Sequence, residues 1–275
     1  MSTVAQPDEE WSWLEDRPVF TTRGERGGNV TIVPPGAVLE PLTLRFWLGV
    51  ASFVVSISLA VVGTGLVISG PSGASPPRGW WWLALAIPAT GLALFSFAGI
   101  YVEGMPRMMR ERPRNLLLLA GLLGGCTLGL AVLAALGGAE GVMPATAVSA
   151  VACAVTALYA ARGIRRARTD VMRILRLRAT GTAHTGVIAA LPDRKTWSHG
   201  GDVPIRYRDD GDEAEHTVTV RVNTWAHEIP VPGTHVIVHR DEEGDLLVEL
   251  DTTHPVEYYP HSQLYEQDTS GGGSM

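Results

Sequence analysis

The sequence predicts a membrane α-helical bundle of four spans, followed by a small all-β domain of the OB-like or SH3-like barrel kind. Three observations predict this fold class. Four long apolar stretches lie between residues 45 and 161, an arginine-rich segment follows them, and the hydrophobic period changes to two beyond residue 180. The chain is 46% hydrophobic and only 18% charged, whereas soluble domains carry about 25% charged residues.

Residues 1–44 are predicted to form a cytoplasmic N-terminal segment that is partly disordered. Residues 19–22 and 29–33 flank a glycine-rich turn and can form a hairpin. The start is acidic and has no apolar run before about residue 45, so we expect no signal peptide. Trp11 and Trp13 are costly if exposed in such a polar segment. We therefore expect them to contact the β-domain, lipid or a protein partner.

The transmembrane bundle is predicted over residues 45–161, with spans at about 46–69, 80–102, 116–136 and 142–161. About 20 apolar residues suffice to cross a bilayer. The loop at 103–114 and the segment after the fourth span are rich in arginine, and the alternate loops are nearly uncharged. The positive-inside rule therefore places both termini in the cytoplasm. Because Lys195 is the only lysine among 22 basic residues, we expect a high-GC bacterium, with the protein in its plasma (inner) membrane.

Small residues form two smooth faces in the last two spans. One consists of Gly121, Gly125 and Gly129, and the other consists of Ala147, Ala150, Ala154, Ala157 and Ala161. Small residues allow helices to approach closely in lipid. The two faces either pack on each other within the chain or form a seam for an oligomer or partner. No ionisable residue lies in the middle of a span, which weighs against a pump or transporter made by this chain alone.

A basic juxtamembrane helix is predicted over residues 162–179. Its arginines are Arg162, Arg165, Arg166, Arg168, Arg173, Arg176 and Arg178. Such a cluster attracts anionic headgroups at about 1 kcal/mol per residue, so membrane lipids are predicted partners. The alternative is that these arginines hold the acidic β-domain. Nucleic acid is not expected, because the final 95 residues carry 17 acidic and six basic residues and repel phosphates.

The β-domain is predicted over residues 180–252. Five runs have strand character, at 181–191, 203–208, 215–223, 234–240 and 246–250. Turn signals at 209–212, 232–233 and 241–245 separate them. Five short strands suit a small barrel, because closure removes exposed edges. Residues 253–275 form a tail, in which 271–275 (GGGSM) are typical of an added linker.

This layout resembles two groups of proteins. The runs G-x-A-x-x-G-x-I (181–188), V-P-I-R-Y-R, V-T-V-R-V and V-P-G-T-H-V-I-V-H-R-D (231–241) resemble the cytoplasmic β-domain of actinobacterial multi-span membrane proteins of unknown function. The order of spans and barrel is similar to NfeD-like proteins. The resemblance covers about residues 165–252 and implies an OB-like domain and a stomatin-type partner. The acidic β-domain and the 44-residue N-terminal segment depart from that pattern.

No catalytic, cofactor or metal residues are predicted. Cys126 and Cys153 lie inside apolar stretches without a C-x-x-C partner. His235 and His239 share a strand face, but four residues of strand separate them by about 13 Å, too far for one metal ion. The sequence therefore predicts a non-enzymatic membrane assembly, scaffold or accessory subunit, whose β-domain binds a protein subunit. The alternative is a channel or transporter component formed by homo-oligomerisation along the Gly121, Gly125 and Gly129 face.

Overall fold

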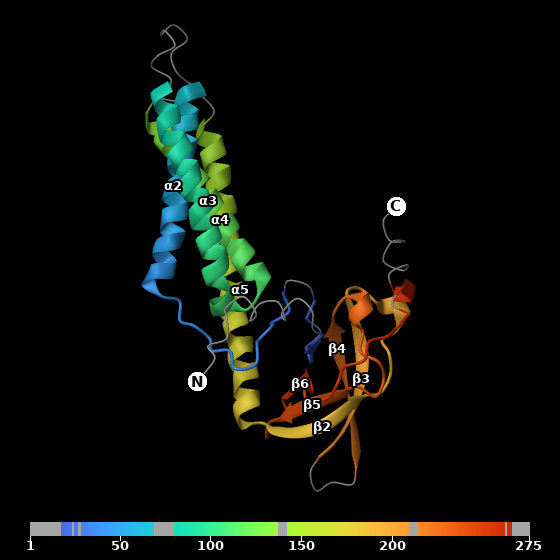
Figure 1. Ribbon diagram of the computed structural model, residues 1–275. Helices are drawn as coiled ribbons and strands as arrows, with labels where there is room; N and C mark the ends of the chain where they lie inside the picture. The colour runs from blue at the N-terminus through green and yellow to red at the C-terminus, as the bar shows by residue number, and fades with distance from the viewer. Residues whose placement is uncertain are drawn as a thin grey trace, which may run out of the picture. The chain divides into compact units, whose positions relative to one another are not determined.

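The computed structural model describes residues 18–23, 25–26, 29–68, 80–136, 142–209, 214–261 and 263–265. The chain forms two compact units (Figure 1). The helical unit comprises Ala37–Val171, and the β unit comprises the residues up to Gly36 together with those from Met172 onward. The β unit is therefore built from both ends of the sequence.

The helical unit contains four long helices. They are α2 (Leu44–Ile68), α3 (Trp80–Met108), α4 (Glu111–Ala135) and α5 (Val142–Thr180). Each is long and apolar enough to cross a membrane, so each predicted span corresponds to a helix. The last helix has 39 residues and continues through the basic segment. Its final nine residues belong to the β unit.

Most of the arginine-rich loop expected at 103–114 is helical. The helix α3 runs on to Met108, and α4 begins at Glu111. Between them Met109 adopts a left-handed φ of 50°, and its backbone N–H donates to the carbonyl of Met105 at 2.9 Å. Pro113 is tolerated because it lies in the first turn of α4, where a backbone N–H has no helical acceptor. The turn between the two helices is therefore only two residues long.

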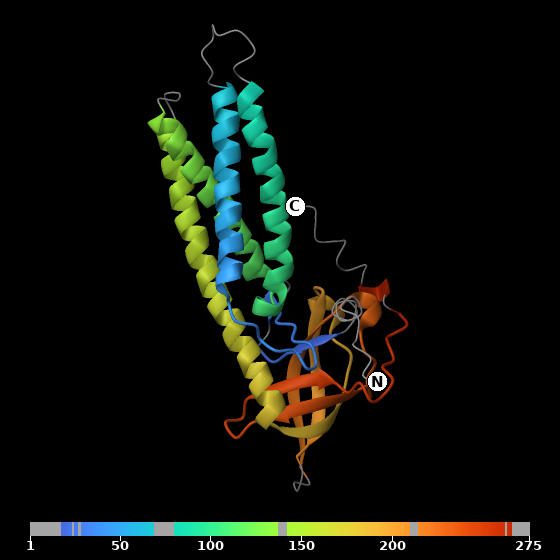
Figure 2. The same cartoon turned by 60° about the vertical axis from the view of Figure 1, so that its left-hand side comes forward.

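The glycine face of α4 packs on α2. An added Cβ at Gly125 would lie 2.5 Å from the Cβ of Ile57 and 2.8 Å from the carbonyl oxygen of Val54. An added Cβ at Gly129 would lie 2.7 Å from the Cβ of Val61, and Gly121 is close to Phe53 in the same way. The missing side chains thus let the backbones approach. Figure 2 shows α2 running alongside α3 as well. The two small-residue faces therefore do not pack on each other.

The β unit contains one antiparallel sheet of six strands, which is nearly closed into a barrel. The strands are β1 (Val19–Thr21), β2 (Thr182–Ile188), β3 (Gly200–Arg208), β4 (Glu215–Asn223), β5 (His235–Arg240) and β6 (Leu246–Leu250). Their order across the sheet is β1-β4-β3-β2-β5-β6. The five runs predicted from the alternating pattern are β2 to β6. The β5–β6 turn places Gly244 at a left-handed φ of 81°, which glycine adopts without strain.

The sixth strand, β1, comes from the N-terminal segment. It pairs with β4 in the register Val19 to Asn223 and Thr21 to Arg221. The expected hairpin between 19–22 and 29–33 is not formed, since the described residues of 29–33 hold no strand. Just after β1, the Thr22 hydroxyl donates to the Leu246 carbonyl at 3.2 Å. This bond joins the two edges of the sheet.

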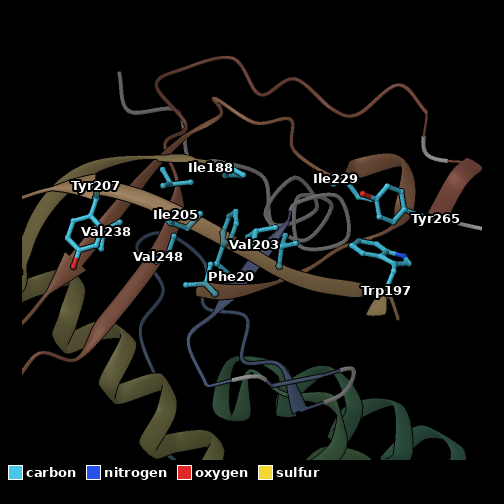
Figure 3. Packing of buried hydrophobic residues seen from close by; sticks show 13 residues of the cluster. Phe20, Ile188, Trp197, Val203, Ile205, Tyr207, Ile229, Val238, Val248 and Tyr265 are labelled. Atoms are coloured by element: carbon cyan, nitrogen blue, oxygen red, sulfur yellow. The ribbon is translucent and has the colours of Figure 1, made fainter. Parts of the chain in front are cut away.

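The core of the β unit lies inside the barrel. Inward residues alternate along each strand, as Val203, Ile205 and Tyr207 do on β3. Figure 3 shows these side chains with Phe20, Ile188, Val238 and Val248. At one end, Trp197 meets Tyr265 edge to face, with ring centroids 5.1 Å apart. Phe20 brings the N-terminal segment into this core, so β1 is an integral part of the barrel.

Candidate functional site at the basic end of α5

The last two turns of α5 carry three arginines that bind the rest of the β unit. We call Arg173, Arg176 and Arg178 the arginine clamp. A helix C-terminus favours cations because its free carbonyls carry partial negative charge. Here the cations also meet carboxylates from the β5–β6 hairpin, so the acidic character of this domain is matched locally.

Arg173 lies where the two edge strands of the sheet meet. Its guanidinium forms a bidentate pair with the Asp245 carboxylate. It also donates to the Thr22 hydroxyl at 3.2 Å and to the Leu246 carbonyl at 2.9 Å. One side chain therefore holds the residue after β1, the start of β6 and the helix. Bidentate arginine–carboxylate pairs are among the strongest charge-assisted hydrogen bonds.

The other two clamp residues extend this contact. Arg176 donates to the Asp241 carboxylate at 3.1 Å. Arg178 donates to Glu249 on β6 at 2.5 Å, and to the carbonyl oxygens of Val33 and Pro34 at 2.5 and 2.8 Å. The clamp thereby joins three parts of the chain that are distant in sequence: the end of α5, the β5–β6 hairpin and the N-terminal segment.

The clamp shifts the titration of two groups. The hydrogen bond from Arg173 is the main cause that lowers the pKa of Asp245 below its ordinary value, although partial burial opposes it. Burial lowers the pKa of His239, and the charge of Arg178 adds to that effect against the opposing carboxylate of Glu249. Asp245 is therefore held as an anion, and His239 is held in its neutral form.

The remaining arginines of the basic segment differ in their surroundings. Arg168 donates to the carbonyl oxygens of Glu40 and Arg107 at 2.8 and 3.1 Å. Arg162, Arg165 and Arg166 are exposed. Lipid contact by the seven arginines stays a prediction. Within the described part of the chain, Arg162, Arg165 and Arg166 have the exposed side chains that contact with lipid headgroups needs.

A second cluster of arginines occupies the α3–α4 turn of the helical unit. Arg107 pairs with Glu40 at 3.1 Å, and Arg110 pairs with Asp170 of α5 at 2.8 Å. Arg114 is only 1% exposed, and its guanidinium carbon lies 3.8 Å from the centroid of the Tyr101 ring. Stacking on an aromatic face is a known way to accommodate a buried guanidinium. These arginines therefore join the α3–α4 turn to the segment before α2 and to α5.

Among the residues that the structure describes, none covers the alanine face of α5. Ala147, Ala150, Ala154, Ala157 and Ala161 are all exposed. A neighbouring face of the helix turns toward α4, where the Thr127 hydroxyl donates to the Ser149 hydroxyl at 2.9 Å. The Cys153 thiol lies 3.5 Å from the Ala120 carbonyl in the same seam. The alanine face is thus a second, outward surface on which a helix can pack closely.

Three further features concern the predicted tryptophans, a carboxylate near two histidines, and metal-ligating groups. Trp11 and Trp13 lie outside the described residues. Sequence reasoning missed Asp209, whose carboxylate lies 3.5 and 3.6 Å from the Nε2 atoms of His184 and His216 and accepts from Arg240 at 2.9 Å. The sequence signal that could have pointed to Asp209 is that His184 and His216 are polar residues at inward-facing strand positions. No group of three or more metal-ligating side chains is placed to hold an ion within the described ranges.

Comparisons with protein-family models, with curated proteins and with solved structures find no match to this chain.

Proposed function

We propose that this protein is a membrane-anchored assembly or accessory subunit. Its helices α2 to α5 cross the inner membrane of a bacterium with both termini in the cytoplasm, and its β unit binds a protein subunit of a larger membrane complex. The order of the apolar helices, basic segment and barrel supports this arrangement, together with the arginine asymmetry between loops.

The observation that carries the proposal is the open alanine face of α5. No residue in the apolar window of this helix is buried, although α5 has small residues at close-packing spacing. In lipid, such faces are the usual contact surfaces between transmembrane helices, because close backbone approach increases van der Waals contact. A helix of another subunit therefore fits this face better than lipid tails do.

The barrel also supports a binding role. The strands β2, β3 and β4 form a meander, and β5 returns to lie beside β2, which is the Greek-key arrangement. OB folds are partly open Greek-key barrels, so this topology supports the OB type for the β unit. The NfeD-like layout, in which a few spans precede such a barrel, points to a protein partner.

The alternative is a channel or transporter component made of copies of this chain. Its copies cannot meet along the Gly121, Gly125 and Gly129 face. The glycine face is covered by α2. A homo-oligomer can still form along the alanine face, and it is an outcome of the test below.

The test compares two double variants of the tagged protein, purified from native membranes in mild detergent. Ala150→Leu with Ala154→Leu fills the alanine face, and Val148→Phe with Val155→Phe adds comparable bulk on another exposed side of α5. Overpacking a helix contact costs about 1–3 kcal/mol. We expect roughly tenfold less co-purified subunit from the first variant, which corresponds to about 1.4 kcal/mol. Equal yields from both variants would refute the proposed seam, and loss of a homo-oligomer would favour the channel alternative.

A further inference from the structure

The β unit has an aromatic surface that the described residues leave open. Trp225 follows β4 and is 55% exposed, and the exposed ring of His199 meets it edge to face with centroids 5.7 Å apart. We call these two residues the Trp225 surface. A large exposed indole on a folded domain is a common mark of a binding site, because tryptophan is enriched among residues that dominate interface energies.

The geometry of this surface is fixed by the protein. His199 has a left-handed φ of 49°, a conformation that is costly for a residue with a side chain and is found where surrounding contacts impose it. Those contacts come from Arg221, which is only 4% exposed. It donates to the carbonyls of Ser198 and Gly200, on either side of His199, at 3.0 and 2.9 Å.

The strand β1 begins near this surface. The strand β1 runs antiparallel to β4, with Val19 opposite Asn223, and Pro18 is buried. Asn223 precedes Trp225 by two positions, so Val19 lies near the Trp225 surface. Trp13 and Trp11 precede Val19 by six and eight positions. At about 3.3–3.6 Å per residue the chain reaches roughly 20–29 Å over that distance, so both indoles can return to Trp225.

Charge and polarity agree with this placement. Residues 1–17 contain five carboxylates and one arginine, and the guanidinium of Arg221 bonds to Ser198 and Gly200 on either side of His199, with Asp202 3.9 Å away. Two tryptophans in an acidic segment gain by leaving water for an aromatic surface.

We propose that the N-terminal segment docks on the β unit of its own chain, with Trp11 and Trp13 covering the Trp225 surface. This inference does not depend on the assembly role proposed above.

The first test is photocross-linking in the full-length protein, purified in detergent. Benzoylphenylalanine replaces Trp225, and in a matched control it replaces Thr217, an exposed residue near the other end of the same strand. We expect cross-links from position 225 to peptides of residues 1–17 within a single chain, and none from position 217. Cross-links only between two chains, only to lipid or other proteins, or equally from both positions would overturn the proposal.

A second test measures hydrogen exchange of the full-length protein by mass spectrometry. In the variant Trp11→Ala with Trp13→Ala, we expect exchange of peptides covering 198–200 and 224–229 to rise by roughly tenfold. The control Ser12→Ala, which lies between the two tryptophans, leaves these peptides unchanged. Unaltered exchange in the double tryptophan variant would rule out docking of these side chains on the Trp225 surface.

Discussion

Arg173 connects the two edge strands of the barrel to the end of α5. Its partners are Asp245, the Thr22 hydroxyl and the Leu246 carbonyl, which belong to opposite edges of the sheet. Exposed salt bridges contribute little, but this pair is mostly buried, with side chains 14% and 24% exposed. Removing one partner of such a pair leaves the other charge poorly compensated.

We therefore expect Arg173→Gln to destabilise the β unit by about 1.5–3 kcal/mol, the range for hydrogen bonds to charged groups. Thermal unfolding of the full-length protein in detergent measures the loss, and hydrogen exchange locates it in β1 and β6. The exposed Arg162→Gln is the control and should have no effect. In a double-mutant cycle of Arg173→Gln and Asp245→Asn, the two losses of unfolding free energy should be strongly non-additive. Additive effects would show that the two side chains do not stabilise each other.

His239 gives the β unit a dependence on pH. Its side chain is 14% exposed and lies 3.7 Å from Glu249, and burial lowers its pKa. The unfolded chain, with a histidine pKa of about 6.5, then binds more protons than the folded chain. Stability is full above that pH and is lost as the pH falls below it toward the lowered folded pKa.

We expect the melting temperature to fall between about pH 6.5 and the mildly acidic range, and His239→Gln to flatten this slope. The exposed His227→Gln serves as a control that keeps the slope. Asp245 acts at lower pH, because its pKa is lowered by Arg173, and its contribution is lost only as the carboxylate is protonated. An unchanged slope in His239→Gln would contradict the assignment.

At the scale of elements, α2 and α4 are matched by spacing. Phe53, Ile57 and Val61 recur every four residues on α2, and they meet glycines with the same spacing on α4. This signal is present in the sequence, yet a glycine face predicts only a close contact and not its partner. The partner is decided by the three-dimensional order of the helices, which local patterns do not contain.

Gly125 and Gly124 provide a matched test of this contact. An added Cβ at Gly125 would lie 2.5 Å from Ile57, whereas at Gly124 its nearest neighbour is the Cys153 sulfur at 3.5 Å. We expect Gly125→Ala to cost about 1–3 kcal/mol by overpacking, while Gly124→Ala is neutral or stabilising. Thermal unfolding in detergent distinguishes them. Equal melting temperatures would mean that α2 does not pack on this face.

The strands show a similar division between local and distant information. Alternation of apolar and polar residues predicted β2 to β6, because each strand buries one face. The three-residue strand β1 is too short for such a pattern, and its partner β4 lies about 200 residues away in sequence. The charge contrast between the basic segment and the acidic domain predicted attraction, but it could not show that Arg173, Arg176 and Arg178 are the residues bound to carboxylates.

At the scale of the whole molecule, the distribution of arginine predicts that both termini lie in the cytoplasm. Single cysteines in a background without Cys126 and Cys153 test this orientation. We expect a cysteine at Arg112 or Thr217 to be protected from an impermeant maleimide in intact spheroplasts, and one at Gly138 to be labelled. The reverse pattern would invert the orientation and place the β unit outside the cytoplasm.

The most direct test of the assembly role is the mass and subunit composition of the particle that the tagged wild-type protein forms in native membranes, measured by native mass spectrometry after mild solubilisation. We predict that the particle contains this chain together with unlike membrane subunits at a fixed ratio. A particle that contains only this chain, whether a single copy or a closed ring, would contradict it.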